Sequence, residues 1–233
     1  FKPSSPNTYY NLGNISNKLD KLEDAEKNYK KAIELKPNFF EAYYNLANTL
    51  KDLDRLEETE KNYKKAIEFK DDDAIVYNNL ASTLEELGRY KEAEKNYKKA
   101  IELKPDFFET YISLAATLRK LNKLDESEEI YSKALNLKPG WKDALFGKGE
   151  TFFEKKNFEL ALRDFDICNT SDSRWRSLTC LYALGKTEEI YERIEKYSDL
   201  DDKNLRVAAF SAFISYKQKK ITKHNFCNNP IDF

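Results

Sequence analysis

The feature that most constrains the fold of this chain is a pattern that recurs every 34 residues. Three segments are near copies of one another: AEKNYKKAIELKP from Ala25, TEKNYKKAIEFKD from Thr59 and AEKNYKKAIELKP from Ala93. A looser copy, SEEIYSKALNLKP, begins at Ser127. A fixed period of this length indicates stacked copies of one small structural unit, which buries its apolar surface against its neighbours.

Each copy has the pattern of two short helices. In the first helix of the second copy, Tyr43, Leu46 and Leu50 recur at spacings of three and four and form one apolar stripe. In the second helix, Tyr63 and Ile67 do the same. Proline cannot continue a helix, and it follows the second helix in three copies, at Pro37, Pro105 and Pro139.

The complete unit resembles the tetratricopeptide repeat. It has an aromatic-x-x-Leu-Gly/Ala segment, then Ala-x-x-x-Tyr-x-x-Ala and a closing proline. The resemblance implies an all-α fold, a right-handed α-solenoid of helix-turn-helix repeats. It covers residues 6–139 closely. The next segment is weaker, because Lys148 stands where Leu is usual and Ser173 replaces the proline.

These matches predict the division of the chain. Residues 174–219 are expected to form a degenerate helical hairpin, broken at Gly185, and one final helix, followed by a tail over residues 220–233. Residues 1–5 are interpreted as the remnant of a preceding repeat, since Phe1–Pro3 align with the end of a unit and the sequence contains no Met. Five repeats are expected between these segments, at residues 6–39, 40–73, 74–107, 108–141 and 142–173.

The composition of the chain restricts the kinds of partner that it can bind. Forty basic residues face 41 acidic ones, so no diffuse attraction to nucleic acid or to an anionic membrane is expected. No run approaches the roughly 18 apolar residues that span a bilayer. The 3 Cys are scattered, which suits a reducing compartment, and we expect a cytoplasmic location.

No catalytic constellation can be assembled from these residues. His224 is the only histidine, so any Ser-His-Asp or Cys-His arrangement would depend on it. His224 and Cys227 have half of a zinc-like spacing, without a second pair to complete it. We therefore expect no catalytic residue, no metal and no cofactor in this chain.

The resemblance implies instead a concave groove lined by the first helix of each repeat. In the family, positions two, five, six, nine and twelve of that helix face the groove. The groove is expected to bind an extended peptide or protein segment. The candidate ligand-binding residues at these positions are Asn7, Tyr10, Asn11, Asn14, Glu41, Tyr44, Asn45, Asn48, Asn78, Asn79 and Arg119.

Three of these asparagines, Asn11, Asn45 and Asn79, are 34 residues apart and predict a row of amides. An amide both donates and accepts, so such a row can hold a peptide backbone with little regard to its sequence. Alternatively, the asparagines only tie neighbouring helices together. A similar row lines the repeat arm of nucleocytoplasmic N-acetylglucosamine transferases. The chaperone-binding members use a clamp of Lys and Asn, from which this chain departs because Tyr10 and Tyr44 replace lysine.

Three hypotheses of function follow. The first is a non-catalytic scaffold that binds peptides or proteins. The second is the substrate-recruiting arm of a larger enzyme of oxygenase or glycosyltransferase type. Its basis is that the sequence from EEIYERIEKY to the end resembles a segment joining such repeats to an iron- and 2-oxoglutarate-dependent oxygenase domain. The third is self-association through uncapped ends of the solenoid, because the first hairpin begins without a polar cap.

Overall fold

The computed structural model describes residues 5–200 and 213–214, with side chains throughout except at residues 198–200. The described residues form helices joined by short turns and divide into two compact units, Phe1–Pro139 and Gly140–Phe233. Among them, no helix is both long and apolar enough to cross a membrane.

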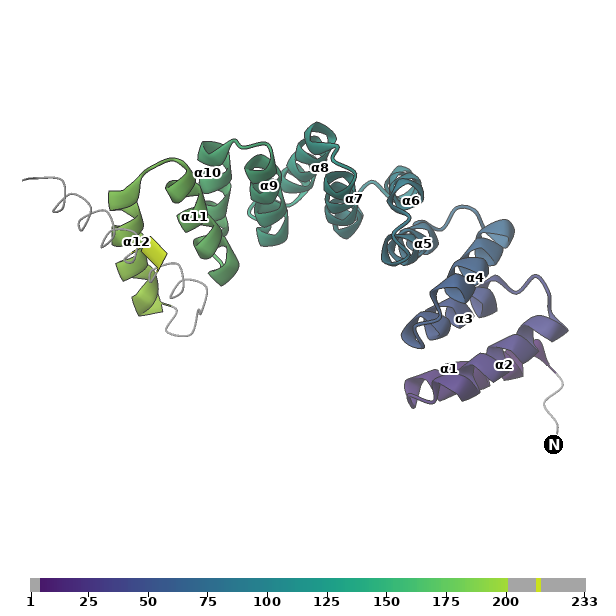
Figure 1. Ribbon diagram of the computed structural model, residues 1–233. Coiled ribbons are helices and arrows are strands. Elements are labelled where there is room, and N and C mark those ends of the chain that lie inside the picture. The colour runs from purple at the N-terminus through teal and green to yellow at the C-terminus, as the bar shows by residue number, and fades with distance from the viewer. Residues whose placement is uncertain (1–4, 201–212, 215–233) are drawn as a thin grey trace, which may run out of the picture. The chain divides into compact units, whose positions relative to one another are not determined.

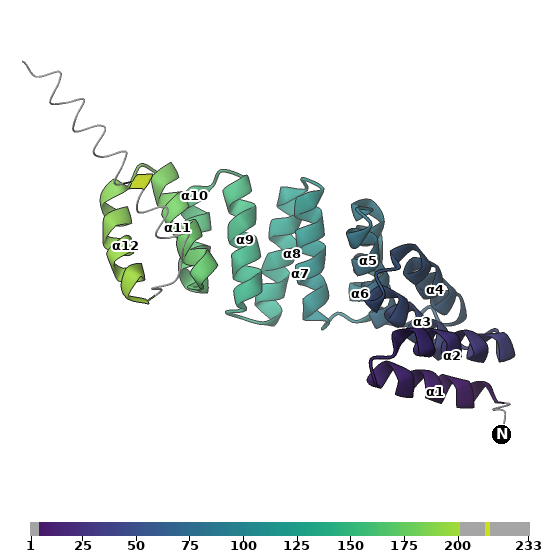
Figure 2. The same cartoon turned by 60° about the horizontal axis from the view of Figure 1, so that its bottom comes forward.

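The first unit consists of four helical hairpins. Each helix packs against the next one along the chain, so that every hairpin contacts the following hairpin mainly through its second helix (Figures 1 and 2). The prolines after α2, α6 and α8 stand two residues beyond the helix end, as the sequence predicts. The helices are α1 (Pro6–Lys18), α2 (Leu22–Leu35), α3 (Phe40–Asp52), α4 (Leu56–Phe69), α5 (Ala74–Glu86), α6 (Tyr90–Leu103), α7 (Phe108–Lys120) and α8 (Leu124–Leu137).

A left-handed residue ends the turn inside each hairpin. Asp20, Asp54 and Asn122 have φ of 57°, 58° and 58°, and Gly88 has φ of 72°. These positions are 34 residues apart. Glycine, Asn and Asp are the residues that adopt this conformation most readily, which explains why they recur here.

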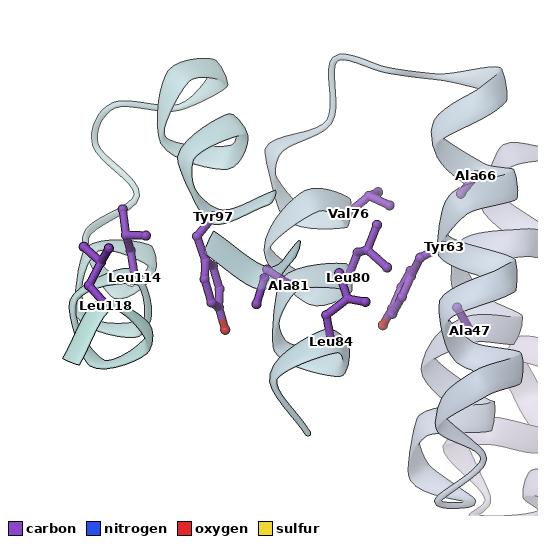
Figure 3. Close-up of a cluster of buried hydrophobic side chains, with 11 residues drawn as sticks. Ala47, Tyr63, Ala66, Val76, Leu80, Ala81, Leu84, Tyr97, Leu114 and Leu118 are labelled. Atoms are coloured by element: carbon purple, nitrogen blue, oxygen red, sulfur yellow. The ribbon is translucent and has the colours of Figure 1, made fainter. Parts of the chain in front are cut away.

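The core of the first unit depends on one tyrosine from each second helix. Tyr63 is only 1% exposed, and Figure 3 shows it facing Val76 and Leu80 of the next hairpin. Tyr97 occupies the equivalent place one repeat later, between Ala81 and Leu114 (Figure 3). Six alanines that recur in the repeats are also fully buried: Ala47, Ala66, Ala81, Ala100, Ala115 and Ala134.

Two hairpins carry glycine where the others carry one of these alanines. A Cβ atom at Gly13 would lie 2.5 Å from the ring of Tyr29, and one at Gly149 would lie 2.7 Å from the ring of Phe165. The aromatic ring of the second helix therefore packs directly on the backbone of the first helix at these two positions.

The second unit contains α9 (Lys142–Glu154), α10 (Phe158–Cys168), α11 (Ser171–Ala183) and α12 (Thr187–Leu200). Thr170 and Ser173 form a capping box at the start of α11, which begins three residues before residue 174, where the degenerate hairpin was expected to start. Gly185, with φ of 74°, lies in the turn between α11 and α12, where the sequence predicts a break. Cys168 of α10 is buried.

The expected final helix and the tail lie largely outside the described residues. Of residues 202–233, only Phe213 and Ile214 are described. Phe213 makes a ring contact with Tyr182 of α11, and Ile214 is buried in the core of the second unit. His224 and Cys227 are not among the described residues, so the expectations about them stay predictions.

Candidate ligand-binding face

The candidate residues lie on α1, α3, α5 and α7, the first helices of the four hairpins of the first unit. We call the surface formed by these residues the first-helix face. Asn7, Asn11 and Glu41 are exposed on it. The remaining candidates are half-buried: Tyr10, Asn14, Tyr44, Asn45, Asn48, Asn78, Asn79 and Arg119.

A hydrogen-bond network joins the first two hairpins at this face. The amide of Asn45 donates to the hydroxyl of Tyr10 over 3.1 Å and to Oδ1 of Asn14 over 2.9 Å. Tyr29, from α2, donates its hydroxyl to the same Asn14 oxygen over 2.8 Å. Asn45 therefore uses both amide hydrogens to bind the preceding hairpin.

The same contacts recur one repeat later. Asn79 donates its amide to the hydroxyl of Tyr44 over 3.3 Å, and the Tyr63 hydroxyl donates to Oδ1 of Asn48. Burial is the main cause that raises the pKa of Tyr63, so its hydroxyl stays protonated and can act as this donor. The first-helix face thus has a repeated tyrosine–asparagine bridge between neighbouring hairpins.

The pattern changes at the third hairpin, where Asn78 takes the place of the bridging tyrosine. Its Oδ1 accepts a hydrogen bond of 2.9 Å from Thr110 of α7. The buried tyrosine of this hairpin, Tyr97, donates to Glu85 over 3.0 Å. Consecutive hairpins are therefore still joined at this position, but through an asparagine and a threonine instead of a tyrosine and an asparagine.

These contacts bear on the two interpretations of the asparagine row. Asn45 and Asn79 donate to tyrosines of the preceding hairpin, as expected if the asparagines tie neighbouring helices together. Asn11 differs, since it is exposed at the surface. The sequence pattern showed the row, but it did not show that the hydroxyls of Tyr10 and Tyr44 are its partners.

One apolar side chain also belongs to the first-helix face. Ile75 is 46% exposed and lies one helical turn before Asn79 on α5. It occupies the same repeat position as Glu41, and this position was among those expected to face the groove. An exposed Ile beside amides is a suitable contact for an apolar ligand side chain.

The charged residues of this face partly neutralise one another. Lys51 of α3 forms an ion pair of 2.8 Å with Glu86 and donates to Ser82 over 2.9 Å. Glu41 is exposed, and Arg119 is half-buried. Charges of both signs therefore accompany the amides.

On the second helices, ion pairs connect the hairpins. Glu60 of α4 binds Lys64 within its own helix and also Arg89 of the next hairpin over 2.6 Å. Burial raises the pKa of Glu60, but the hydrogen bonds from Lys64 and Arg89 outweigh it and hold the pKa below its usual value. The equivalent pairs are Glu26 with Arg55 and Glu94 with Lys123.

No group of three or more His, Cys, Asp or Glu side chains in the described part of the chain is arranged to hold a metal ion. The first-helix face offers hydrogen-bonding side chains and the exposed Ile75.

Comparison with known families identifies the repeat. Family models described as tetratricopeptide repeat match residues 6–39, 38–106 and 84–146, which together cover more than half of the chain. The sequence and the stacked hairpins agree with this match. The chain belongs to the tetratricopeptide repeat proteins.

Solved structures of the same fold resemble the chain along most of its length. A tetratricopeptide repeat protein from Parabacteroides merdae superposes with a TM-score of 0.74 at 17% identity, covering 92% of this chain and 87% of that one. MamA has a TM-score of 0.67 at 21% identity, with 79% and 94% covered. YrrB, described as a TPR protein with an unusual peptide-binding site, has a TM-score of 0.66 at 26% identity, with 76% and 90% covered. No curated protein matches the chain.

Proposed function

We propose that this chain is a non-catalytic scaffold that binds an extended peptide or protein segment on its first-helix face. The observation that carries the proposal is the repeated tyrosine–asparagine bridge, which fixes polar side chains of successive hairpins on one surface. YrrB, a structural relative, is described as having a peptide-binding site, which supports the same class of ligand.

The bridges would favour binding because they immobilise the polar groups before a ligand arrives. A side chain that is already ordered loses less conformational entropy on binding. Both amide hydrogens of Asn45 are already donated to Tyr10 and Asn14. Toward a ligand, Asn45 would therefore accept a hydrogen bond from an N–H group through its Oδ1. Asn11, which is exposed, can both donate and accept.

Apolar contact would come from the tyrosine rings and from Ile75. Tyr10 and Tyr44 are half-buried, and their rings lose little rotamer entropy when a ligand covers them. Charges of both signs lie nearby, so affinity should depend only modestly on salt. The proposed ligand is an extended segment with an apolar side chain and no strong net charge.

The test begins with a peptide-library selection on the wild-type chain, followed by titration of variants with the best peptide. Asn11→Ala should weaken binding by about 3- to 10-fold, the value of roughly one hydrogen bond, and should leave the melting temperature unchanged. Changing Asn11, Asn45 and Asn79 together should weaken binding by about one to three powers of ten.

Asn62→Ala is the matched control, because Asn62 lies on α4 and donates only to the Glu58 carbonyl of its own helix. If the triple variant is folded and binds the peptide as wild type does, the asparagine row only supports the structure. The proposed binding face would then be wrong.

The hypothesis of an enzyme arm stays a prediction, because it concerns sequence outside this chain. The parent gene tests it directly. A catalytic oxygenase or glycosyltransferase domain in the same reading frame would support it, and a stop codon directly after Phe233 would contradict it.

A further inference from the structure

The first unit contains a hollow that the proposed function does not use. It has a volume of about 360 Å³, lies between α2, α3 and α4, and is large enough for a few side chains of a ligand. We call it the second-helix hollow. Its lining residues are Lys30, Ile33, Tyr43, Leu46, Glu58, Lys61, Asn62 and Lys65. They do not include any candidate residue of the first-helix face.

The second-helix hollow has an apolar part where the first hairpin meets the second. Ile33 of α2 and Tyr43 of α3 are half-buried, and Ile33 packs against the core cluster that contains Leu46. The ring of Tyr43 lies 5.6 Å from the ring of Phe69, measured between the ring centres, so it is held in place. An apolar ligand side chain that covers Ile33 and Tyr43 removes their exposed surface from water, which favours binding.

Most charged groups of the second-helix hollow are already neutralised by ion pairs of 2.6 or 2.7 Å. These pairs are Lys30 with Glu26, Lys65 with Glu68 and Glu58 with Arg55. Lys61 differs, because it is exposed and forms no ion pair within residues 5–200 and 213–214. Its acidic neighbour one helical turn earlier, Glu57, does not line the hollow. The ammonium group of Lys61 is therefore available to an anionic group of a ligand.

The hydroxyl of Tyr43 is a second available donor, since it makes no hydrogen bond to the residues that the structure describes. A carboxylate in the hollow can accept from both Lys61 and Tyr43, and hydrogen bonds to an ionised acceptor are the stronger ones. The chemistry that fits the hollow is thus a carboxylate beside an apolar side chain.

The same eight residue types recur 34 residues later, at Lys64, Ile67, Tyr77, Leu80, Glu92, Lys95, Asn96 and Lys99. Their ion pairs recur as well: Lys64 with Glu60, Glu92 with Arg89 and Lys99 with Glu102. Lys95 takes the place of Lys61, and one repeat further on the position is Glu129. Two positions in the first unit therefore have the same set of side chains.

We propose that the second-helix hollow and the equivalent residues one repeat later each bind a peptide segment in which an acidic residue stands next to an apolar one. The carboxylate binds Lys61 and Tyr43, or Lys95 and Tyr77, and the apolar side chain covers the neighbouring isoleucine. A partner with two such segments engages both sites. The proposal stands whether or not the first-helix face binds a peptide.

The experiment is isothermal titration calorimetry of the full chain at low ionic strength. The probe is a blocked tetrapeptide of alternating leucine and glutamate. One comparison peptide has glutamine in place of glutamate, and the other has serine in place of leucine. We expect the probe to bind at two sites per chain, and each comparison peptide to bind at least threefold more weakly.

Two variants test the residues. Lys61→Gln/Lys95→Gln should weaken binding of the probe about threefold, because each site loses its available cation. Tyr43→Phe/Tyr77→Phe keeps both rings and removes only the hydroxyls, and it should also weaken binding about threefold.

The control variant is Lys27→Gln/Lys91→Gln, which removes the same charge and should keep the wild-type affinity. Lys91 is exposed and lies outside both residue sets. Lys27 is the equivalent of Lys61 in the first hairpin, but Tyr9 is the only apolar or aromatic residue that lines the hollow beside it. The proposal is overturned by equal weakening in the control, by unchanged affinity in either test variant, by a comparison peptide that binds as tightly as the probe, or by a probe that does not bind. A single site per chain contradicts the equivalent site.

Discussion

At the scale of the residue, the turn inside each hairpin contains one position with a left-handed backbone conformation, which few side chains adopt readily. The left-handed residue of this turn is Asp20, Asp54, Gly88 or Asn122 in the first unit, and Lys156 or Gly185 in the second. Lys156 has φ of 61° and lacks the short polar side chain that eases this conformation. Lys156 is therefore poorly suited to the left-handed backbone conformation that this turn of the fifth hairpin requires.

Replacing Lys156 with glycine should therefore stabilise the second unit. Left-handed geometry costs a side-chain-bearing residue roughly 1–2 kcal/mol, and part of that gain is lost to the greater freedom of glycine in the unfolded chain. We expect Lys156→Gly to raise the free energy of unfolding by about 0.5–1 kcal/mol, measured by urea denaturation. Lys155→Gly, where φ is −71°, is the control and should destabilise. An equal effect of both changes would show that the left-handed geometry is not strained.

At the scale of the element, partly buried ion pairs join the second helices α2, α4 and α6 to the hairpin that follows each of them. The side chain of Glu60 lies between α4 and the turn before α6, and the whole residue is only 9% exposed. Its ion pairs with Lys64 and Arg89 are less screened than a pair on an open surface. These contacts predict a specific pH dependence of stability.

The folded pKa of Glu60 lies below its ordinary value of 4.5. Its contribution is therefore fully present above about pH 4.5 and is lost as the pH falls through the folded pKa. Glu60→Gln should lower the free energy of unfolding by about 1 kcal/mol at pH 7, and this difference should shrink in acid. Denaturation measured from pH 7 to pH 3 checks it.

The control for this change is Glu68→Gln, because Glu68 pairs with Lys65 on an exposed part of the same helix. A solvated pair of this kind contributes little, so the control should differ from wild type by less than about 0.5 kcal/mol at every pH. If Glu60→Gln lowers the free energy of unfolding by the same amount at every pH, packing and not charge makes Glu60 stabilising.

At the scale of the whole molecule, the two compact units should differ in stability. Residues 6–139 consist of near-identical repeats, and consensus units are the more stable ones in linear arrays. The second unit lacks this regularity, and Trp141 and Trp175 both belong to it. We expect it to unfold first.

Fluorescence of the two tryptophans should therefore change at a lower urea concentration than the far-UV circular dichroism signal, to which all helices contribute. Trp141→Phe leaves Trp175 as the single reporter and should preserve the order of the two transitions. Coincident curves from the two probes would mean that both units unfold as one.

A further prediction at this scale concerns self-association. On α1, Leu12 and Ile15 are exposed, and Ile15 is 54% exposed, whereas the equivalent Leu46 and Thr49 of α3 are buried. We propose that this apolar face of α1 drives association of the chain with itself. Ile15→Lys should then shift a dimer towards monomer in sedimentation velocity experiments.

The control for this prediction is Asn7→Lys, which adds the same charge at an exposed position on α1. If wild-type chain is monomeric at every concentration, or if both variants shift it equally, the face does not drive association. Circular dichroism must show that each variant remains helical.

The sequence by itself determined the local structure of this protein. The apolar spacing of Leu46 and Leu50, the proline at Pro37 and the recurrence of Tyr63 every 34 residues predict helices, helix ends and a buried stripe. These signals act between residues no more than about four positions apart, or repeat identically from copy to copy. They therefore sufficed for the class of fold and for the surface on which the candidate residues lie.

Only the tertiary structure decided which partners these side chains have. Asn45 binds Tyr10, 35 residues away, and Arg55 binds Glu26, 29 residues away. The same holds in the second unit, where Arg193 of α12 binds Asp166 of α10, 27 residues away. The physical reason is that contacts between hairpins depend on how each hairpin packs and turns against the last. No local preference of the chain encodes this rotation, because it follows from the fit of whole helices.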